Sequence, residues 1–232
     1  RIWQEHDSLA PVFGSLRRVA FIQCMGSRDR KGGNPFCSKV CCGYAARMAR
    51  RIRWEAAQTS VTIFHQDFQA RSALWSALAA ADPGITLIRS LPSQAYQLPK
   101  QGVVLNWEAA PAGGNQTAEF DLVVLSIGIT PGDFNAEAEK SLGIARDTGG
   151  FLEASGLAAD AAGAAGATDA ADGFRQQTGL VDPGDEFRQT GIFLAGTCSG
   201  PADLSTTFAQ GKRAAGQLIE YLNRGASGGA IG

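Results

Sequence analysis

The sequence predicts an α/β fold built on a βαβ unit of the dinucleotide-binding kind. Residues 16–23 (LRRVAFIQ) form a largely apolar run, which is typical of a strand buried in a parallel sheet. Residues 39–57 contain no proline and are rich in Ala and Arg, which favours a helix. Residues 61–64 (VTIF) supply a second short strand. The order strand, helix, strand is that of a βαβ unit.

The composition excludes several classes of protein. The 232 residues carry a formal net charge of −1 with a pI near 6.2, and 44% of them are hydrophobic. Such a charge creates no basic field for nucleic acid, although a short basic run lies at Arg47, Arg50, Arg51 and Arg53. No apolar run approaches the roughly 18 residues of a membrane span, and no signal-peptide pattern opens the chain. We expect a soluble, cytoplasmic protein without a nucleic-acid partner or a transmembrane segment.

Three segments are expected to lie outside the folded elements. The chain begins at Arg1 rather than at Met, so we expect a C-terminal fragment of a longer protein, with residues 1–16 leading in from the missing region. Residues 155–173 are of low complexity and rich in Ala, Gly and Asp, a composition that supports a packed core poorly. We expect a flexible insertion there and a tail at residues 225–232.

Four of the five cysteines fall in the turn after the first predicted strand: Cys24, Cys37, Cys41 and Cys42. In a dinucleotide-binding βαβ unit this turn carries a G-x-G-x-x-G loop, whose bare backbone lets a pyrophosphate approach the helix N-terminus. The glycines present do not form that pattern, and no acidic residue closes the second strand. The sequence therefore predicts a dinucleotide fold in which a thiolate site replaces the phosphate loop.

The other predicted elements continue the α/β layout. Ser38 is the expected N-cap of the first helix. Residues 72–81 predict an Ala-rich helix, ended by the Asp-Pro-Gly sequence that follows. Further strands are expected over residues 85–89, 103–107, 120–127 and 191–195, with a hairpin-like turn at Gly113 and Gly114. An amphipathic helix from about Leu204 to Asn223 offers five apolar side chains to a core: Leu204, Phe208, Leu218, Ile219 and Leu222. Its orphan N-H groups would point into a cleft.

The bunched cysteines leave three chemistries open. In a reducing compartment such a group binds metal or carries out redox chemistry more often than it forms a disulfide framework. Four thiolates suit tetrahedral zinc, yet zinc sites more often pair C-x2-C knuckles, and these are absent. Four thiolates also suit a 4Fe-4S cluster, and Cys41 with Cys42 is a candidate redox dithiol.

A series of motifs bears on the choice between these three chemistries. IQCMGSRD, CSKVCCGYA, VVLSIGITP and GIFLAGTCSGPAD occur in this order between residues 17 and 224. The series resembles the A-type flavoprotein component of heterodisulfide reductases, within the wider thioredoxin-reductase-like FAD family. The spacing C-x12-C-x3-C-C is its most specific part. The resemblance implies that Cys24, Cys37, Cys41 and Cys42 hold a 4Fe-4S cluster close to a flavin.

Arg47 is the candidate catalytic residue. The resembling family usually has a Lys five residues after the last cysteine, where it approaches flavin N5, and this chain has Arg47 there. An Arg keeps the charge but not the ability to deliver a proton. With the helix dipole, it is expected to lower the thiolate pKa values. The alternative is a solvated helix residue.

The resemblance also implies one half of an FAD site, made by Gly196, Thr197, Phe208, Ala209 and Gln210. Phe208 is equally a core residue on its apolar period. The G-x-G-x-x-G half of the site is absent, so the chain alone is expected to bind FAD incompletely or not at all. Cys198 is expected to be a small buried thiol rather than a redox group. His6 and His65 are assigned no catalytic role.

These features together predict a thioredoxin-reductase-like chain with two domains. Residues 17–132 would form an NAD(P)-domain-like domain with the cysteine cluster, and residues 133–224 the C-terminal half of an FAD-binding domain. The expected function is that of an oxidoreductase passing electrons between FAD and the cluster. Expected partners are other subunits of a disulfide-reducing or quinone-linked complex, a ferredoxin-type carrier and a second copy of the chain. The alternatives are a flavoenzyme with a Cys41/Cys42 dithiol and a zinc-stapled, non-enzymatic subunit.

Overall fold

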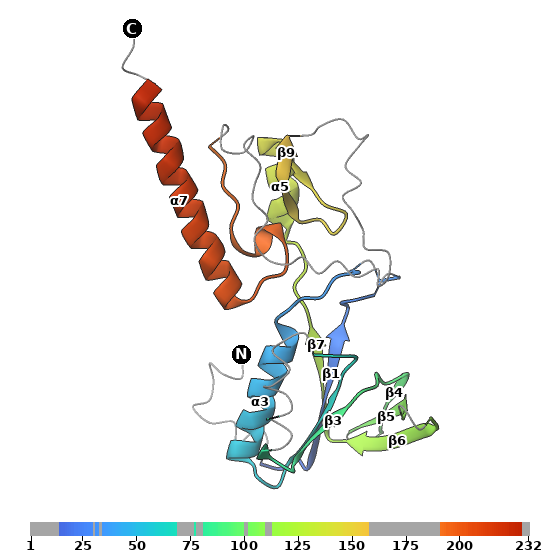
Figure 1. The fold of residues 1–232 in the computed structure, drawn as a ribbon. Coiled ribbons are helices and arrows are strands. Elements are labelled where there is room, and N and C mark those ends of the chain that lie inside the picture. The colour runs from blue at the N-terminus through green and yellow to red at the C-terminus, as the bar shows by residue number, and fades with distance from the viewer. Residues whose placement is uncertain are drawn as a thin grey trace. The chain divides into compact units, whose positions relative to one another are not determined.

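The chain divides into two compact units (Figure 1). The first unit contains residues 1–26 and 39–128, and the second contains residues 27–38 and 129–232. The computed structural model describes residues 14–29, 31–32, 34–68, 77, 81–99, 102–109, 113–157 and 191–228.

A four-stranded parallel sheet forms the centre of the first unit. Its order is β3-β2-β1-β7, with strands β1 (Arg18–Met25), β2 (Ser60–Phe64), β3 (Ile85–Ile88) and β7 (Leu122–Ile127). Helix α3 (Cys41–Glu55) connects β1 to β2. The predicted βαβ unit and its parallel pairing are therefore confirmed.

The two faces of this sheet are covered by different elements (Figure 1). Alternate residues of β1 point to opposite faces, so Val19 and Phe21 pack with the apolar side of α3, while Ala20 and Ile22 join the other cluster. That second cluster includes Leu105 and the rings of Phe64 and Phe120. It is covered by an antiparallel sheet of β4 (Gln94–Gln97), β5 (Val103–Glu108) and β6 (Asn115–Phe120). The first unit is thus a sheet buried on both faces.

The predicted strand over residues 120–127 is confirmed as β7, but it begins at Leu122 rather than at Phe120. β6 ends at Phe120 and β7 begins at Leu122, and the two belong to different sheets. The break lies at Asp121, whose carboxylate accepts hydrogen bonds from the backbone N-H groups of Arg17 (2.6 Å) and Arg18 (2.8 Å). The hairpin partner of β5 is therefore β6, and β7 is free to pair with β1.

The predicted N-cap Ser38 is also wrong. The residue before α3 is Val40, and no side chain caps the helix. The Ser38 hydroxyl instead lies 2.8 Å from the Ser27 hydroxyl and accepts the N-H of Ile129 at 2.9 Å, all within the second unit. Ser38 therefore does not cap the first turn of α3.

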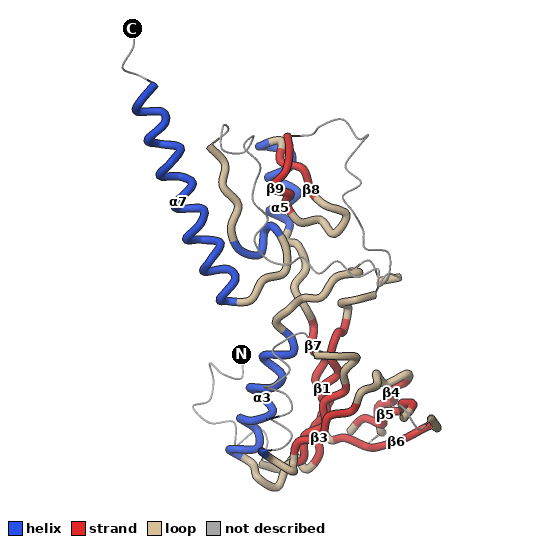
Figure 2. The backbone as a smooth tube through the Cα atoms, in the orientation of Figure 1, coloured by secondary structure: helices blue, strands red, loops and turns tan. Residues whose placement is uncertain are grey.

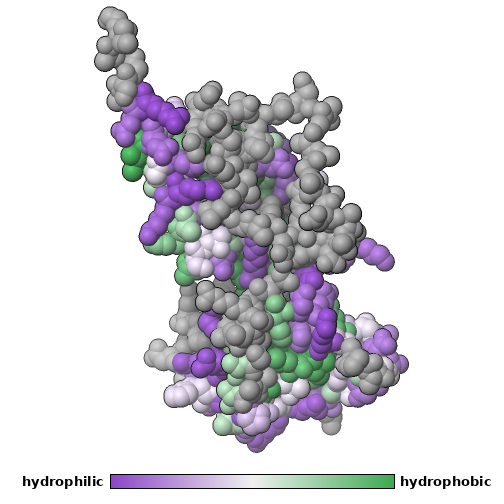
Figure 3. Space-filling model, in the orientation of Figure 1, coloured by the Kyte–Doolittle hydropathy of each residue, from purple (hydrophilic) through white to green (hydrophobic). Residues whose placement is uncertain are grey.

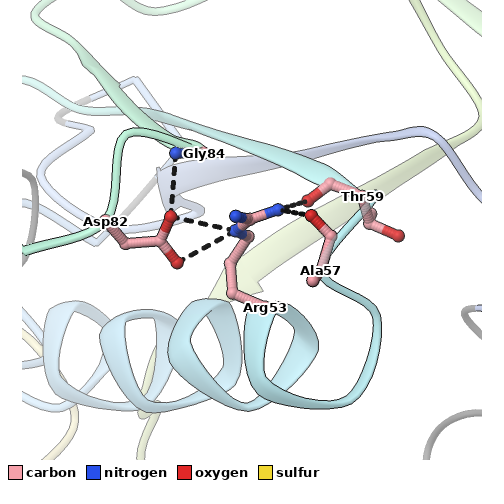
Figure 4. Close-up of polar contacts among 5 residues, drawn as sticks. All are labelled: Arg53, Ala57, Thr59, Asp82 and Gly84. Atoms are coloured by element: carbon pink, nitrogen blue, oxygen red, sulfur yellow. Dashed lines mark hydrogen bonds and ion pairs between the residues drawn. The ribbon is translucent and has the colours of Figure 1, made fainter.

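An arginine clamp holds the C-terminal end of α3 (Figure 4). Arg53 Nε contacts both carboxylate oxygens of Asp82, at 3.1 and 2.9 Å. Its Nη1 donates to the backbone oxygens of Ala57 and Thr59. Asp82 Oδ1 also accepts the N-H of Gly84 at 2.8 Å, and a Cβ at Gly84 would overlap the guanidinium. The clamp therefore ties α3 to the turns that precede β2 and β3.

Asp82→Asn is expected to lower the free energy of unfolding by about 1.5–3 kcal/mol at neutral pH, the usual value of a hydrogen bond to a charged group. The hydrogen bond from Arg53 holds the pKa of Asp82 below its ordinary value. A lowered carboxyl pKa adds stability above the unfolded pKa of about 4, and this is lost as the pH falls through the folded value. The difference between wild type and variant in urea unfolding should therefore shrink in acid. Glu139→Gln, which breaks an exposed pair with Arg146, should cost about 0.5 kcal/mol or less; equal losses would refute the clamp.

The second unit contains two helices, a two-stranded sheet and a short 3-10 helix among its described residues (Figure 2). In chain order these are α5 (Asp133–Leu142), β8 (Ile144–Arg146), β9 (Leu152–Leu157), η1 (Gly196–Ser199) and α7 (Leu204–Gly228). Ala138, Ile144 and Leu152 form its small core, with Ile192, Leu194 and Cys198 packed against it. Asn135 links α5 to its surroundings by donating to the backbone oxygens of Gly150 and Cys198, at 3.1 and 3.0 Å.

Of four further segments predicted from the sequence, one is confirmed, one is wrong and two lie largely outside the described residues. The C-terminal helix is confirmed as α7. The strand expected over residues 191–195 is wrong, since these described residues pair with no strand. The helix expected over residues 72–81 lies outside the described residues except at 77 and 81. Of the insertion expected over 155–173, residues 155–157 end β9 and the rest lie outside the described residues.

The apolar side chains of α7 are exposed within the second unit. Leu204, Phe208, Leu218, Ile219 and Leu222 all lie on the surface, and apolar atoms show along this helix in Figure 3. Their predicted place in a core is therefore wrong, because α7 packs mainly on the segment around η1 and contacts it through other residues, including Tyr221 against Phe193. Among the described residues, no helix is both long and apolar enough to cross a bilayer.

Candidate functional site

Cys24 occupies a distorted position at the carboxyl end of β1. The pairing of β1 with β7 shifts register between Ile22 and Met25, which is a bulge around Cys24. Its φ is 59°, a left-handed conformation that costs an L-residue other than glycine about 1–2 kcal/mol. Bulges re-aim side chains and occur beside functional sites, and strain of this kind concentrates there. The fold therefore holds Cys24 in a conformation that strand pairing alone would not select.

Cys41 and Cys42 begin α3 and are both buried. The hydrogen bond from Cys42 lowers the pKa of Cys41 to about 6, helped by the backbone N-H groups of Cys42, Cys24 and Cys41 and opposed by burial. Arg47 is not the source of this shift. Cys41 therefore favours the thiolate at neutral pH, and its sulfur lies beside the backbone of Cys24.

Cys37 belongs to the second unit, just before α3 in the chain. It is buried and follows a tight turn in which Arg28 N-H donates to the Phe36 oxygen at 3.0 Å and Asp29 forms a bridge with Asn34. The ring of Phe36 packs edge-on against Phe151, with centroids 5.2 Å apart. None of the five cysteines forms a disulfide. In the described part of the chain, no three His, Cys, Asp or Glu side chains are gathered closely enough to hold a metal ion.

A buried polar group that the sequence reasoning missed lies beside these cysteines. Gln23 and Ser126 are both fully buried, and Gln23 Nε2 donates to Ser126 Oγ at 3.0 Å. Tyr44, from the first turn of α3, donates its hydroxyl to the backbone oxygen of Ile127 at 2.5 Å. Burial, followed by the charge of Cys41, raises the pKa of Tyr44 to about 12. The only sign of this buried pair in the sequence is that Gln23 and Ser126 are polar residues inside two apolar strands.

The predicted flavin residues form a turn and a helix start. Gly196 has φ 80°, and its N-H donates to Gln210 Oε1 at 2.9 Å. Gln210 therefore fastens η1 to α7, while Thr197 and Ala209 are exposed. Phe208 is 64% exposed with the Lys212 ammonium 4.9 Å from its ring centroid, so its alternative place in a core is wrong for this unit.

The N-terminus of α7 is partly capped. Asp203 Oδ1 accepts the N-H of Thr206 at 2.8 Å and the Ser205 hydroxyl at 3.0 Å. This corrects the expectation of a fully orphaned helix end. Cys198 donates its thiol to the Ala195 oxygen at 3.2 Å and is partly exposed. Arg47 is exposed on α3, with its guanidinium near Gly43.

The chain has relatives among heterodisulfide reductase components. No protein-family model matches it. It is 32% identical over 213 residues to the second A-type iron-sulfur component of the CoB-CoM heterodisulfide reductase of Methanopyrus kandleri, covering 90% of this chain and 29% of that protein. It is 30% identical over 212 residues to the corresponding A-type component of Methanocaldococcus jannaschii, with the same coverage of both chains. The chain thus spans less than a third of the length of these relatives.

A solved structure with the same fold is the thioredoxin reductase of T. acidophilum, with a TM-score of 0.51 and 15% identity, covering 93% of this chain and 55% of that one. This likeness confirms the predicted thioredoxin-reductase-like α/β fold. Over 90% of its length, the chain is therefore a homologue of one segment of the A-type iron-sulfur component of heterodisulfide reductases.

Proposed function

We propose that this chain carries the cysteine-rich part of an electron-transferring iron-sulfur flavoprotein, an oxidoreductase component of the heterodisulfide reductase type. Cys24, Cys37, Cys41 and Cys42 hold a 4Fe-4S cluster. Electrons pass between the cluster and FAD, within a multisubunit disulfide-reducing or quinone-linked complex supplied by a ferredoxin-type carrier. The observation that carries the proposal is the placement of the buried Cys41 and Cys42 at the start of α3, with the Cys41 thiol beside the backbone of the strained Cys24.

The residue types of the four candidate ligands suit such a cluster. A 4Fe-4S cluster takes four cysteine thiolates, and the four candidate cysteines are buried and form no disulfide. Cys37 lies four residues before Cys41, so the chain limits their Cα separation to about 14 Å. When bound, the cluster supplies one-electron storage. The chain supplies the ligands and excludes water around Cys41 and Cys42. It also supplies the positive end of the α3 dipole, and the first turn of α3 holds no acidic residue.

The flavin half of the proposal rests on the segment from η1 into α7. Gly196 presents bare backbone at the turn, and Gln210 fixes that turn to the helix. We propose that Thr197, Phe208 and Ala209 line the flavin from this side, where their exposure leaves room for a ligand, and that Arg47 is the flavin-facing cation.

Anaerobic reconstitution with iron and sulfide tests the electron-transfer role. The loaded chain should show a broad visible absorption that bleaches on reduction with dithionite, and a paramagnetic signal of about one electron per chain. The signal should disappear on reoxidation and return on a second reduction. A bound metal that takes up no electron would contradict the proposal.

A Cys41/Cys42 dithiol is the second candidate, because Cys42 already lowers the pKa of Cys41. Geometry counts against it, since neighbouring Cα atoms lie about 3.8 Å apart and disulfides usually need about 4.4–6.8 Å. NAD(P)H-dependent disulfide reduction that survives complete removal of iron would favour the dithiol over the cluster.

A further inference from the structure

Gln23 has one polar atom that the fold leaves without a partner. Its side chain is 0% exposed, so bulk water does not reach it. Nε2 donates to Ser126 Oγ, but Oε1 is buried and meets no donor among the described residues. Buried polar atoms are almost always hydrogen-bonded, and an exception in a folded protein calls for an explanation.

The position of Gln23 places this unpartnered end below the first turn of α3. Side chains alternate along β1, so Gln23 shares with Val19 and Phe21 the face that α3 covers. It lies beyond Phe21 toward the carboxyl end of β1, next to Cys24 in the chain. The thiol of Cys41 also lies there, within reach of the Cys24 backbone N-H. The Gln23 amide therefore lies on the side of the sheet that carries the first turn of α3, and that turn begins with Cys41 and Cys42.

Ser126 and Tyr44 hold this region together. Ser126 lies on β7, beside β1, and its hydroxyl fixes one end of the Gln23 amide. The Ser126 side chain also interacts with the Tyr44 hydroxyl, and Tyr44 anchors the first turn of α3 to the Ile127 oxygen. The amide consequently has little freedom to move away from the helix start.

The amide can present either of its ends to the cysteines. Oxygen and nitrogen of a glutamine side chain have nearly the same shape, and their assignment follows from the hydrogen bonds available. Turned by half a rotation, Oε1 accepts the Ser126 hydroxyl proton and the NH2 group occupies the unpartnered place. An N-H donor is then directed at the region below the first turn of α3, where Cys41 and Cys42 begin the helix. Hydrogen bonds to sulfur are among the factors that set the potential of an iron-sulfur cluster.

We propose that Gln23 is a positioning residue that donates a side-chain hydrogen bond to sulfur at the cysteine site and so raises the reduction potential of the group bound there. This role rests on the proposed cluster. The hydrogen bond stabilises the more negative, reduced form, because the donor's partial positive charge lies closest to the sulfur that gains electron density. Ser126 acts through Gln23 by fixing the amide.

The test compares reduction midpoints of the reconstituted chain in four forms: wild type, Gln23→Leu, Ser126→Ala and Thr59→Val. Gln23→Leu should shift the midpoint to a lower potential, and Ser126→Ala should shift it less in the same direction. Thr59→Val removes another fully buried polar group, which bonds to Leu16 at the opposite end of the sheet, and should leave the midpoint unchanged.

A spectroscopic measurement separates a hydrogen bond from a general change in polarity. Electron-nuclear double resonance on the reduced wild type should detect an exchangeable proton that is absent from Gln23→Leu. An unchanged midpoint in Gln23→Leu, or a proton signal that persists there, overturns the role of Gln23 and leaves the cluster standing. If Gln23→Leu does not load with iron, Ser126→Ala decides by the same readouts. A wild type that binds no iron overturns the proposed function and this role with it.

Discussion

Cys41→Ser is expected to lower the iron content of the reconstituted chain by more than about tenfold, since a lost ligand should cost at least as much as a lost supporting residue. Cys41 has the thiol whose pKa is lowered to about 6, so it is largely a thiolate at neutral pH and ready to bind iron. A serine hydroxyl keeps its proton at that pH and cannot take its place. The measurement is iron and acid-labile sulfide per chain after anaerobic reconstitution and gel filtration.

Cys198→Ser is the matched control for this result. Cys198 is a cysteine of the second unit whose thiol donates to a backbone oxygen, and its replacement should leave the iron content unchanged. Circular dichroism of the metal-free variants should match the wild type, since a serine fits the space of a cysteine. Loss of iron in Cys198→Ser together with its retention in Cys41→Ser would contradict the assigned ligand set.

Cys24→Gly is expected to be more stable than Cys24→Ser, which reverses the usual order for glycine in a strand. Both lose a thiol, but glycine adopts the φ of 59° found at this position without strain. The metal-free glycine variant should therefore be more stable than the serine variant by about 1 kcal/mol. Urea unfolding of the two metal-free proteins measures this difference, and both variants should hold little iron.

The same pair of substitutions at Cys41 supplies the control. Cys41 lies in the first turn of α3, where glycine is less favourable than serine by about 0.5 kcal/mol. The order of stability should therefore reverse between the two positions. A Cys24→Gly variant that is less stable than Cys24→Ser would show that the strained conformation at Cys24 does not exist.

The sequence was sufficient for the elements that depend on local pattern. The run at residues 16–23, the proline-free segment at 39–57 and the run at 61–64 became β1, α3 and β2. Burial of continuous apolar runs on both faces of a parallel sheet explains why this part was predictable. The concentration of cysteines at one turn was likewise visible from spacing alone.

The failures at Ser38 and Asp121 involve partners that are distant in the chain. Ser38 bonds to Ile129, 91 residues away, instead of capping α3. Asp121 ends β6 because it meets the amides of Arg17 and Arg18, more than 100 residues earlier. A capping rule or a strand propensity cannot include such contacts, because they exist only once β1 and β7 have paired.

The details of the candidate site could not be predicted, for the same reason. The bond between Gln23 and Ser126 joins residues 103 positions apart. The left-handed backbone of Cys24 has no signal in its residue type, since that conformation is typical of glycine and asparagine. The thiol set was therefore predictable, whereas its strain and its buried polar neighbours required the fold.

The most direct test of the central claim is the metal content of the wild-type chain purified without oxygen. A 4Fe-4S cluster held by Cys24, Cys37, Cys41 and Cys42 predicts iron and acid-labile sulfide in equal amounts, at about four of each per chain. One zinc per chain, with neither iron nor sulfide, would contradict the account and would assign the four cysteines to a structural site.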